Sequence, residues 1–318
     1  MRFPFNIPQD RRFDAAGFGL NAVDQLIVVP EYPAFDAKMR LVEHRRSAGG
    51  QTATAMVTLQ RLGCTTAYAG RFGSDETGRY GLASLEKEGV NLEFAEVING
   101  ARNQNAYIII DARNGERTII WERDERLAYE ADEAPIALAS QGRVMHLDAH
   151  DPPACKRVAE AAKGAGTIVS ADIDNIYEGL PELLPLIDIL ISSREFPHRL
   201  TGISDERTSL VEMKARYGCA LVGMTMGKCG AMIYSDGQFL ESPAYEVPGG
   251  CRDTTGAGDA FHGGFLYGLF SGEDIETSLK LANATAALKC RDLGARTSLP
   301  TLNELNGFMN DPQITPIT

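Results

Sequence analysis

The chain has 318 residues, of which 44% are hydrophobic and 23% charged, a composition typical of a globular protein that buries a full core. Its formal net charge of −12 argues against a nucleic-acid partner or an anionic membrane surface, because both attract clustered basic residues. The acidic balance still permits a small anionic ligand, since a few backbone N–H groups can hold a phosphate locally.

The N-terminal segment and the cysteines indicate the cellular compartment of the protein. The first residues, MRFPFNIPQDRRFDAAGFG, carry charges and prolines but lack the apolar centre of a signal peptide. No stretch approaches the roughly 18 apolar residues of a membrane span. The six cysteines are scattered without a C-x-x-C pair, so we predict reduced thiols and a cytoplasmic protein.

The first half of the chain alternates between strand and helix patterns. Residues 15–29 predict two strands joined by a turn, and 48–63 predict a helix that follows a glycine pair and ends at Gly63. Residues 65–75 predict a strand, and 77–90 a helix closed by Gly89. The alternation continues to the C-terminus, which favours an α/β fold with a doubly wound, mostly parallel sheet covered by helices on both faces.

One segment interrupts this alternation. Residues 105–124 contain two β-rich runs around Asn114-Gly115, a strong hairpin signal. Residues 22–46 lack helical periodicity and could supply further strands. We therefore expect one domain over residues 1–318 that carries a small β-sheet lid formed by about 22–46 and 101–124.

The stretch DTTGAGDAFHGGF at 253–265 carries the clearest chemical signal. Small residues Gly256, Ala257 and Gly258 precede an apolar helical face, so they are expected at a helix N-terminus, where free N–H groups and the helix dipole can hold an anion. Asp259 falls in the first turn, where the dipole favours an ionised carboxylate. The alternative is a tight strand-to-helix turn in which Asp259 only complements the dipole.

Two other glycine-rich stretches do not support a nucleotide site of their own. GFGLNA at 17–22 has the glycine spacing of a dinucleotide-binding turn, but the residues after it are β-branched and end in prolines rather than forming a helix. GMTMGKC at 223–229 is one residue too short for a phosphate-binding loop, and Cys229 stands where a hydroxyl is required.

Four segments in order resemble the ribokinase/PfkB family of ATP-dependent carbohydrate kinases. They are AGGQTATAMVTLQRLG (48–63), GRFGSDETG (70–78), TMGKCGA (225–231) and DTTGAGDAF (253–261). The C-terminal segments look most like the branch of sulfofructose kinase and ketohexokinase. Gln51 and Thr54 depart from the asparagines common after the glycine pair, and Ser192 replaces the asparagine of an N-x-x-E segment that keeps Glu195.

The resemblance implies a catalytic centre and a nucleotide site. Asp259 matches the family's catalytic base, and Gly256, Ala257 and Gly258 match its anion hole. Glu195 resembles the residue that holds Mg²⁺ through water. The residues that match the ATP-binding positions are Ser192, Thr225, Gly227, Gly230 and Asn283.

The resemblance also implies a substrate end and a cation site. The matching or neighbouring positions for the sugar are Asp24, Gly49, Gly50, Thr54, Asn105 and His150. The family often binds K⁺ beside the anion hole, and the positions that correspond are Asp253, Thr255, Gly294 and Ser298. Each of these residues also has a purely structural explanation, such as a turn, a cap or a buried histidine.

The resemblance therefore implies a kinase that uses ATP and Mg²⁺ to phosphorylate a hydroxymethyl group of a monosaccharide or a sugar derivative. The alternatives are a nucleoside kinase of the adenosine type and a non-catalytic regulator that binds a sugar or a nucleotide. Apolar residues of the lid strands predict a homodimer formed through the lid, namely Val29, Tyr32, Ile108, Ile110, Ile119 and Trp121.

Overall fold

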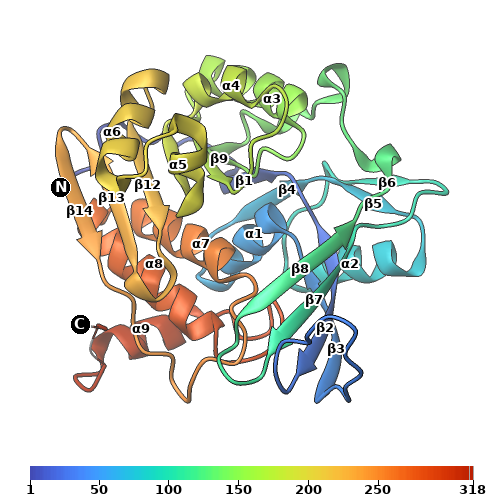
Figure 1. Ribbon diagram of the computed structural model, residues 1–318. Helices are drawn as coiled ribbons and strands as arrows, with labels where there is room; N and C mark the ends of the chain where they lie inside the picture. Colours follow the sequence, from blue (N-terminus) through green and yellow to red (C-terminus); the bar gives the residue numbers. More distant parts are fainter. Residues whose placement is uncertain (315, 318) are drawn as a thin grey trace.

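A computed structural model describes residues 1–314 and 316–317, and its centre is an eight-stranded sheet (Figure 1). The strands are β1 (Phe13–Phe18), β4 (Thr66–Ala69), β9 (Gly142–Leu147), β10 (Ile168–Ile173), β11 (Ile189–Ser193), β12 (Leu221–Thr225), β13 (Ala231–Ser235) and β14 (Gln238–Ser242). Their order is β14-β13-β12-β11-β10-β9-β1-β4. All pairs from β4 to β12 are parallel, and β13 and β14 add antiparallel strands at one edge.

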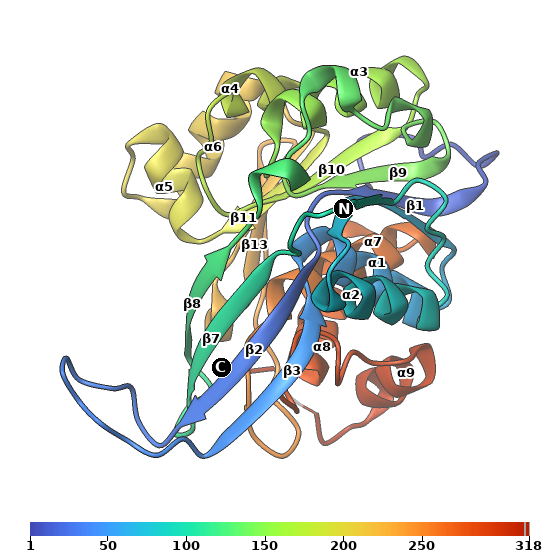
Figure 2. The same cartoon turned by 90° about the vertical axis from the view of Figure 1, so that its right-hand side faces the viewer.

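Helices cover both faces of this sheet, as Figure 2 shows. One layer contains α3 (Pro152–Gly164), α4 (Leu180–Leu183), α5 (Glu195–Thr201) and α6 (Glu206–Tyr217). The other contains α1 (Gln51–Arg61), α2 (Glu76–Lys87), α7 (Ala257–Phe270), α8 (Ile275–Lys289) and α9 (Leu302–Asn310). Each layer has its own apolar core against the sheet, which explains why every residue of β10 is buried.

A second, four-stranded sheet stands away from the main body and is called the lid sheet here. It has the order β3 (Glu43–Gly49), β2 (Ala22–Val29), β7 (Asn105–Asp111) and β8 (Arg117–Glu122). The hairpin expected around Asn114-Gly115 joins β7 to β8, and residues within 22–46 supply β2 and part of β3. A short pair, β5 (Arg71–Gly73) and β6 (Glu96–Ile98), and single turns of 3₁₀-helix complete the chain; the turns are η1 (Glu125–Leu127), η2 (Ala131–Glu133), η3 (Ile136–Leu138), η4 (Leu184–Leu186) and η5 (Gly227–Cys229).

The apolar side chains of the lid sheet are distributed differently from the prediction. Ile108 and Ile110 are buried, in a small core that includes Leu293 of the main body. Ile119 lies directly opposite Ile108 in the ladder and therefore shares its face. The outward face instead exposes Tyr107 and Ile120, at 42% and 56% of their surface. Val29 is buried and Trp121 shares the inner face, so of the six residues expected outside only Tyr32 is exposed away from that face.

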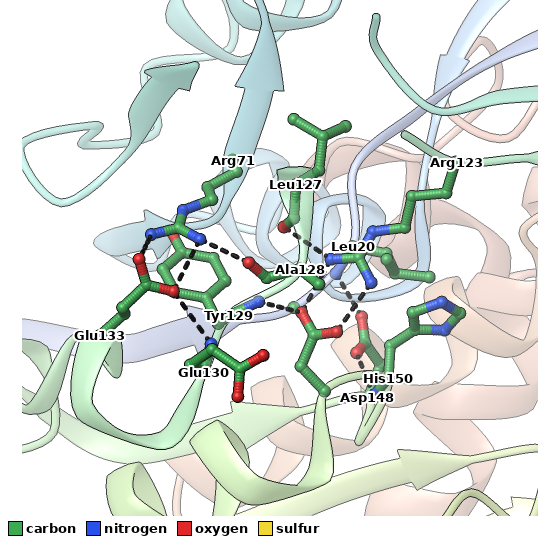
Figure 3. Close-up of polar contacts among 12 residues, drawn as sticks. Leu20, Arg71, Arg123, Leu127, Ala128, Tyr129, Glu130, Glu133, Asp148 and His150 are labelled. Carbon is green, nitrogen blue, oxygen red and sulfur yellow. Dashed lines mark hydrogen bonds and ion pairs between the residues drawn. The ribbon is translucent and has the colours of Figure 1, made fainter. Parts of the chain in front are cut away.

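Both ends of β8 are tied to the main body. At the hairpin end, the Arg117 guanidinium donates to the hydroxyl of Thr254 at 2.7 Å, and that hydroxyl donates to the Gly115 carbonyl at 3.2 Å. Just beyond the other end, Arg123, which Figure 3 labels, forms a bidentate ion pair with Asp151 at 2.8 and 2.7 Å. The lid sheet is therefore joined to the loop before α7 at one end of β8 and to the loop after β9 near the other end.

Within the described residues, no helix is long and apolar enough to cross a membrane.

Close packing of α7 against α8 depends on glycine. A Cβ added at Gly264 would lie 2.6 Å from the Thr285 hydroxyl and 2.9 Å from Cα of Ala282, so the two helices would have to separate. Both helices are buried over most of their length. This packing fixes the direction in which the N-terminus of α7 points.

We predict that Gly264→Ala lowers the free energy of unfolding by about 1–3 kcal/mol through overpacking, despite the better helix propensity of alanine. Gly307→Ala in α9 is the matched control, because an added Cβ there meets no described atom within 4 Å. It should be neutral or stabilising by up to about 1 kcal/mol. Denaturant unfolding measures both; equal effects of the two substitutions would contradict the packing argument.

Candidate functional site

A cavity of about 1010 Å³ lies between the lid sheet and the carboxyl ends of the central strands. This is the position where open α/β sheets bind ligands. The expected site residues that line it are Asp24, Gly50, His150, Thr225, Gly227, Gly230, Thr255, Gly256, Ala257, Gly258, Asp259 and Asn283. The remaining ones, Gly49, Thr54, Asn105, Ser192, Glu195, Asp253, Gly294 and Ser298, lie behind its wall or beside it.

The N-terminus of α7 opens into this cavity. Gly256 is the N-cap residue and has a left-handed φ of 79°. A Cβ there would also lie 2.8 Å from the backbone of Ala295, so the turn requires glycine. Asp259 lies in the first turn, as the sequence predicted. The N–H group of Ala257 donates to the Thr254 carbonyl at 3.1 Å, whereas those of Gly258 and Asp259 begin the helix and suit an anion.

The charge state of Asp259 differs from the expectation based on the helix dipole. Burial raises the pKa of this carboxyl well above its usual range, and the nearby carboxylates of Asp172 and Asp24 raise it further. Arg117 and Arg296 oppose that effect. Asp259 is therefore a stronger proton acceptor than an exposed carboxylate, because desolvation and like charges outweigh the dipole.

Asp24 lies on β2 and enters the cavity from the lid sheet. Its side chain is only 4% exposed, and burial raises its pKa to about 7. Gly49 of β3 pairs with Ala22, and a Cβ at Gly49 would overlap the Asp24 carboxylate. The second glycine of the pair, Gly50, caps α1 with a φ of 94° and lines the cavity. The pair therefore makes room for a carboxylate and for a ligand beside it.

Arg296 supplies the cation behind this group, and the sequence analysis did not identify it. It is 5% exposed and lies in the loop after α8. Its guanidinium donates to the Thr54 hydroxyl at 3.2 Å and to the Gly49 carbonyl, and its charge lowers the pKa of Asp24. Thr54 was expected to contact the substrate; it is fully buried and does not line the cavity.

A buried carboxylate–imidazole pair lies next to Asp259 and was also missed. Asp172 at the end of β10 and His262 of α7 approach at 3.3 Å, and both line the cavity. The nearby side-chain amide of Gln51 also lowers the pKa of Asp172. One signal was present in the sequence, because His262 follows Asp259 by three residues and so lies on the same side of a helix.

Aromatic side chains form the wall of the cavity near the lid. The ring of His150 lies 5.5 Å from Trp121 of β8 and 5.0 Å from Tyr177, both nearly edge to face. Asp148 holds this loop, because its carboxylate accepts the N–H groups of His150 at 3.2 Å and Leu20 at 2.5 Å (Figure 3).

Strand alternation decides which residue at the start of β7 reaches this space. Gln104 lines the cavity, as does Ala106, whereas Asn105 turns its amide back to the Asn103 carbonyl at 3.2 Å. The hairpin signal located the strand correctly but did not fix which of two adjacent side chains faces inward.

The far end of the cavity is lined by β12, the turn after it and α8. Thr225, Gly227 and Gly230 lie there together with Lys228. Asn283 donates to the carbonyls of Ser242 and Pro243 at 2.9 and 3.1 Å, so it holds the backbone of this wall.

The residues after β10 and β11 place further polar groups near this end. Ser192 is buried and donates to the Gly223 carbonyl at 3.4 Å, and Ser193 lines the cavity in its place. Glu195 begins α5 and is exposed outside the lining. Asp174, which follows β10, faces the cavity, and its surroundings raise its pKa to about 6.

The residues expected to hold K⁺ lie close together, but they surround the ammonium group of a lysine and its carboxylate partner. Lys289 of α8 is completely buried; its ammonium donates to the Asp253 carbonyl at 2.8 Å and lies 3.9 Å from the Asp253 carboxylate. That carboxylate accepts the N–H groups of Thr255 and Gly294 at 2.8 and 2.7 Å. Ser298 donates to the Lys289 carbonyl.

Comparisons with known proteins agree with this geometry. The family model of pfkB family carbohydrate kinases matches residues 18–302. A nucleoside kinase of Methanothermobacter thermautotrophicus is 26% identical over 92% of this chain and 94% of its own, and fructokinase-1 of Zea mays is 30% identical over 82% and 87%. A solved ribokinase of Arabidopsis thaliana, complexed with ribose and ATP, has the same fold, with a TM-score of 0.79, 22% identity and coverage of 94% and 99%. The chain belongs to the pfkB family of carbohydrate kinases, which are phosphotransferases with an alcohol acceptor.

Proposed function

We propose that this protein transfers the γ-phosphate of ATP to a hydroxymethyl group of an uncharged sugar, with Asp259 as the base. The observation that carries the proposal is the position of Asp259, a half-buried carboxylate of raised pKa directly beside a glycine-capped helix N-terminus in the cavity. A base and an anion hole side by side are what phosphoryl transfer requires.

In this mechanism Asp259 accepts the proton of the acceptor hydroxyl as the new O–P bond forms. The N–H groups of Gly258 and Asp259 hold an oxygen of the transferring phosphoryl group, and the positive end of the α7 dipole stabilises its charge. Asp24 accepts hydrogen bonds from other hydroxyls of the acceptor and orients it.

The nucleotide fits the end of the cavity that β12 and α8 line. Backbone at Gly227 and Gly230 allows a flat base or phosphates to pack closely, and Lys228 offers a cation to the phosphates. A solved Escherichia coli structure of the same fold contains ATP and Mg²⁺. In this chain Mg²⁺ would neutralise phosphate charge, and the exposed Glu195 would hold it through water, since Mg²⁺ keeps several waters.

The charges around the acceptor end favour an uncharged substrate. Four carboxylates line the cavity there, namely Asp24, Asp172, Asp174 and Asp259. Among the described residues, the cation that lines the same end is Arg117, whose guanidinium already bonds Thr254. A phosphate, sulfonate or carboxylate on the acceptor would meet like charge, which argues against the sulfofructose type of substrate that the C-terminal segments suggested.

A nucleoside is the second candidate acceptor, and the aromatic wall is the observation that favours it. Trp121, His150 and Tyr177 present ring edges and faces that can pack on the C–H face of a sugar or on a nucleobase. Both acceptors are uncharged and rich in hydroxyls, so they share the carboxylate contacts.

We predict that uncharged sugars or nucleosides stimulate ADP formation from Mg-ATP, whereas ribose 1-phosphate, sulfofructose and 2-keto-3-deoxygluconate do not. Asp259→Asn should lower kcat by about 10²–10⁴-fold, the usual effect of losing a general base. Asp132→Asn, an exposed aspartate in η2, is the control and should retain the rate. A rate that survives Asp259→Asn would contradict the assignment of the base; ATP binding without turnover on every acceptor would favour the regulator.

We further infer that the Lys289 ammonium takes the place of the K⁺ ion expected beside the anion hole. It already bonds the Asp253 carbonyl and neutralises the Asp253 carboxylate from inside the fold. A second cation at the same carbonyl would be repelled, so the family's K⁺ requirement is not expected here.

Initial rates measured in KCl, NaCl and tetramethylammonium chloride at equal ionic strength should therefore agree within about twofold, because only general screening remains. Lys289→Met should destabilise the protein by about 3–5 kcal/mol, since it leaves the buried Asp253 charge unpaired. Strong activation by K⁺ alone would show that the ammonium does not replace the ion.

We also propose a homodimer through the outer face of the lid sheet. Tyr107 and Ile120 are exposed there, and the neighbouring connection between β2 and β3 exposes Tyr32, Phe35 and Leu41. An exposed apolar surface of this extent favours aggregation unless another protein surface covers it.

Sedimentation velocity at micromolar protein should give about twice the 34.5 kDa chain mass. Ile120→Lys with Tyr107→Lys should give monomers, because two buried charges would face each other across a twofold axis. The exposed substitution Val211→Lys on α6 is the control. A wild-type protein that sediments as a monomer contradicts the proposal.

A further inference from the structure

The mechanism above leaves a chain of buried titratable groups beside Asp259 without a role. His262 has 2% of its surface exposed and Asp172 has 8%, and they pair at 3.3 Å. Behind them, His146 of β9 has no exposure, and its ring lies 5.3 Å from that of His262. Nδ1 of His146 is 3.2 Å from the Ser170 hydroxyl, and its Nε2 has no partner among the described residues.

Burying such groups costs free energy, so we ask what function their arrangement serves. Burial lowers the pKa of His146 to about 3, so this ring is neutral and adds no charge to the cluster. Burial alone would raise the pKa of Asp172, but the charge and the hydrogen bond of His262 reverse that effect, and the net shift is downward. The pair therefore keeps a negative charge on Asp172 in an interior that would otherwise protonate it.

That charge acts on Asp259. Among the charged groups facing Asp259, Asp172 of β10 has the largest effect and Asp24 of β2 a smaller one of the same sign. Arg117 of β8 and Arg296 of the loop after α8 oppose them. Because His262 lies one helical turn beyond Asp259 on α7, the same helix positions both the base and the partner of the neighbouring carboxylate.

We propose that the Asp172–His262 pair is a positioning unit that sets the basicity of Asp259: His262 holds Asp172 ionised, and the adjacent negative charge makes Asp259 the stronger proton acceptor. This inference rests on the proposed function, in which Asp259 is the base. During transfer the acceptor hydroxyl gives its proton to Asp259, the O–P bond forms, and the bond between the γ-phosphorus and the leaving oxygen of ADP breaks. Asp259 ends as a carboxylic acid, a form that the neighbouring charge stabilises relative to the carboxylate.

Two substitutions separate the steps of this argument. Asp172→Asn removes the negative charge while keeping the size of the side chain. His262→Gln leaves a hydrogen-bond donor near Asp172 but removes the imidazole, so the buried carboxylate is expected to take up a proton. Both therefore leave position 172 without its negative charge, and the double variant should show no more than either single change.

The experiment is NMR titration of the full-length protein labelled with ¹³C at the aspartate side-chain carboxyl. Asp259→Asn identifies the Asp259 resonance by its loss. In Asp172→Asn and His262→Gln the Asp259 midpoint should fall by about one pH unit, the size expected when one nearby like charge is removed. His198→Gln, an exposed histidine on α5, is the control and should leave the midpoint in place.

Kinetics supply the second readout. The acid limb of the kcat/KM profile should move to lower pH in both variants, and kcat at neutral pH should fall while KM for ATP stays constant; a structural defect alone would not shift the limb. An unchanged Asp259 midpoint in both variants overturns the inference. A midpoint that shifts while the rate survives Asp259→Asn instead overturns the assignment of Asp259 as base, and the pair then has no catalytic role. The two failures are thus distinguishable.

Discussion

In the proposed mechanism the N-terminus of α7 holds an anion and a carboxylate at the same point, and the charges around it are consistent with that constraint. A phosphoryl group needs free N–H donors and a positive dipole end, whereas a base needs an environment that favours its protonated form. Burial satisfies the second need but strengthens every repulsion in the cavity. Three of the carboxylates around the N-terminus of α7, namely Asp253, Asp24 and Asp172, have a cation or an imidazole from another element nearby.

These balancing contacts divide the site into three parts. Lys289 of α8 pairs with Asp253 behind the anion hole, the charge of Arg296 lowers the pKa of Asp24 at the acceptor end, and His262 pairs with Asp172 beside Asp259. The partners come from the lid sheet, the central sheet, two helices and the loop after α8. Since unpaired buried charges are costly, the site is complete only when all of these elements have packed. The glycines of α7 matter for this reason as well, because they let α1 and α8 approach the helix that carries Asp259.

The sequence predicted those features that depend on neighbouring residues. The strand–helix alternation, the hairpin at Asn114-Gly115 and the helix that begins after Gly256 all rest on local conformational preferences, and the structure confirms them. Lys289 and Arg296 could not be found in this way. A basic residue near a helix end is ordinarily solvated, and only the tertiary fold turns these two inward.

The prediction that Asn105, and not its neighbour Gln104, faces the cavity was wrong because it also depends on the tertiary fold. Asn105 and Gln104 are adjacent in a strand, so the direction of each side chain depends on the register with β2, which the residues themselves do not specify. The ionisation of Asp259 was misjudged because the helix dipole is visible in a sequence, whereas desolvation and the carboxylate of Asp172 are properties of the assembled cavity.

The two unusual residues of the glycine-pair segment fit this view. Thr54 accepts a hydrogen bond from Arg296, and Gln51, which lines the cavity, lowers the pKa of Asp172, so both positions lie beside buried charges. In the proposed function, contacts that select the acceptor are made by Asp24, by Gln104 and by the aromatic wall at His150, all of which belong to the lid sheet or to the loops facing it. The hairpin that bonds Thr254 also carries Trp121 into that wall, so the same element anchors the lid sheet and lines the proposed acceptor site.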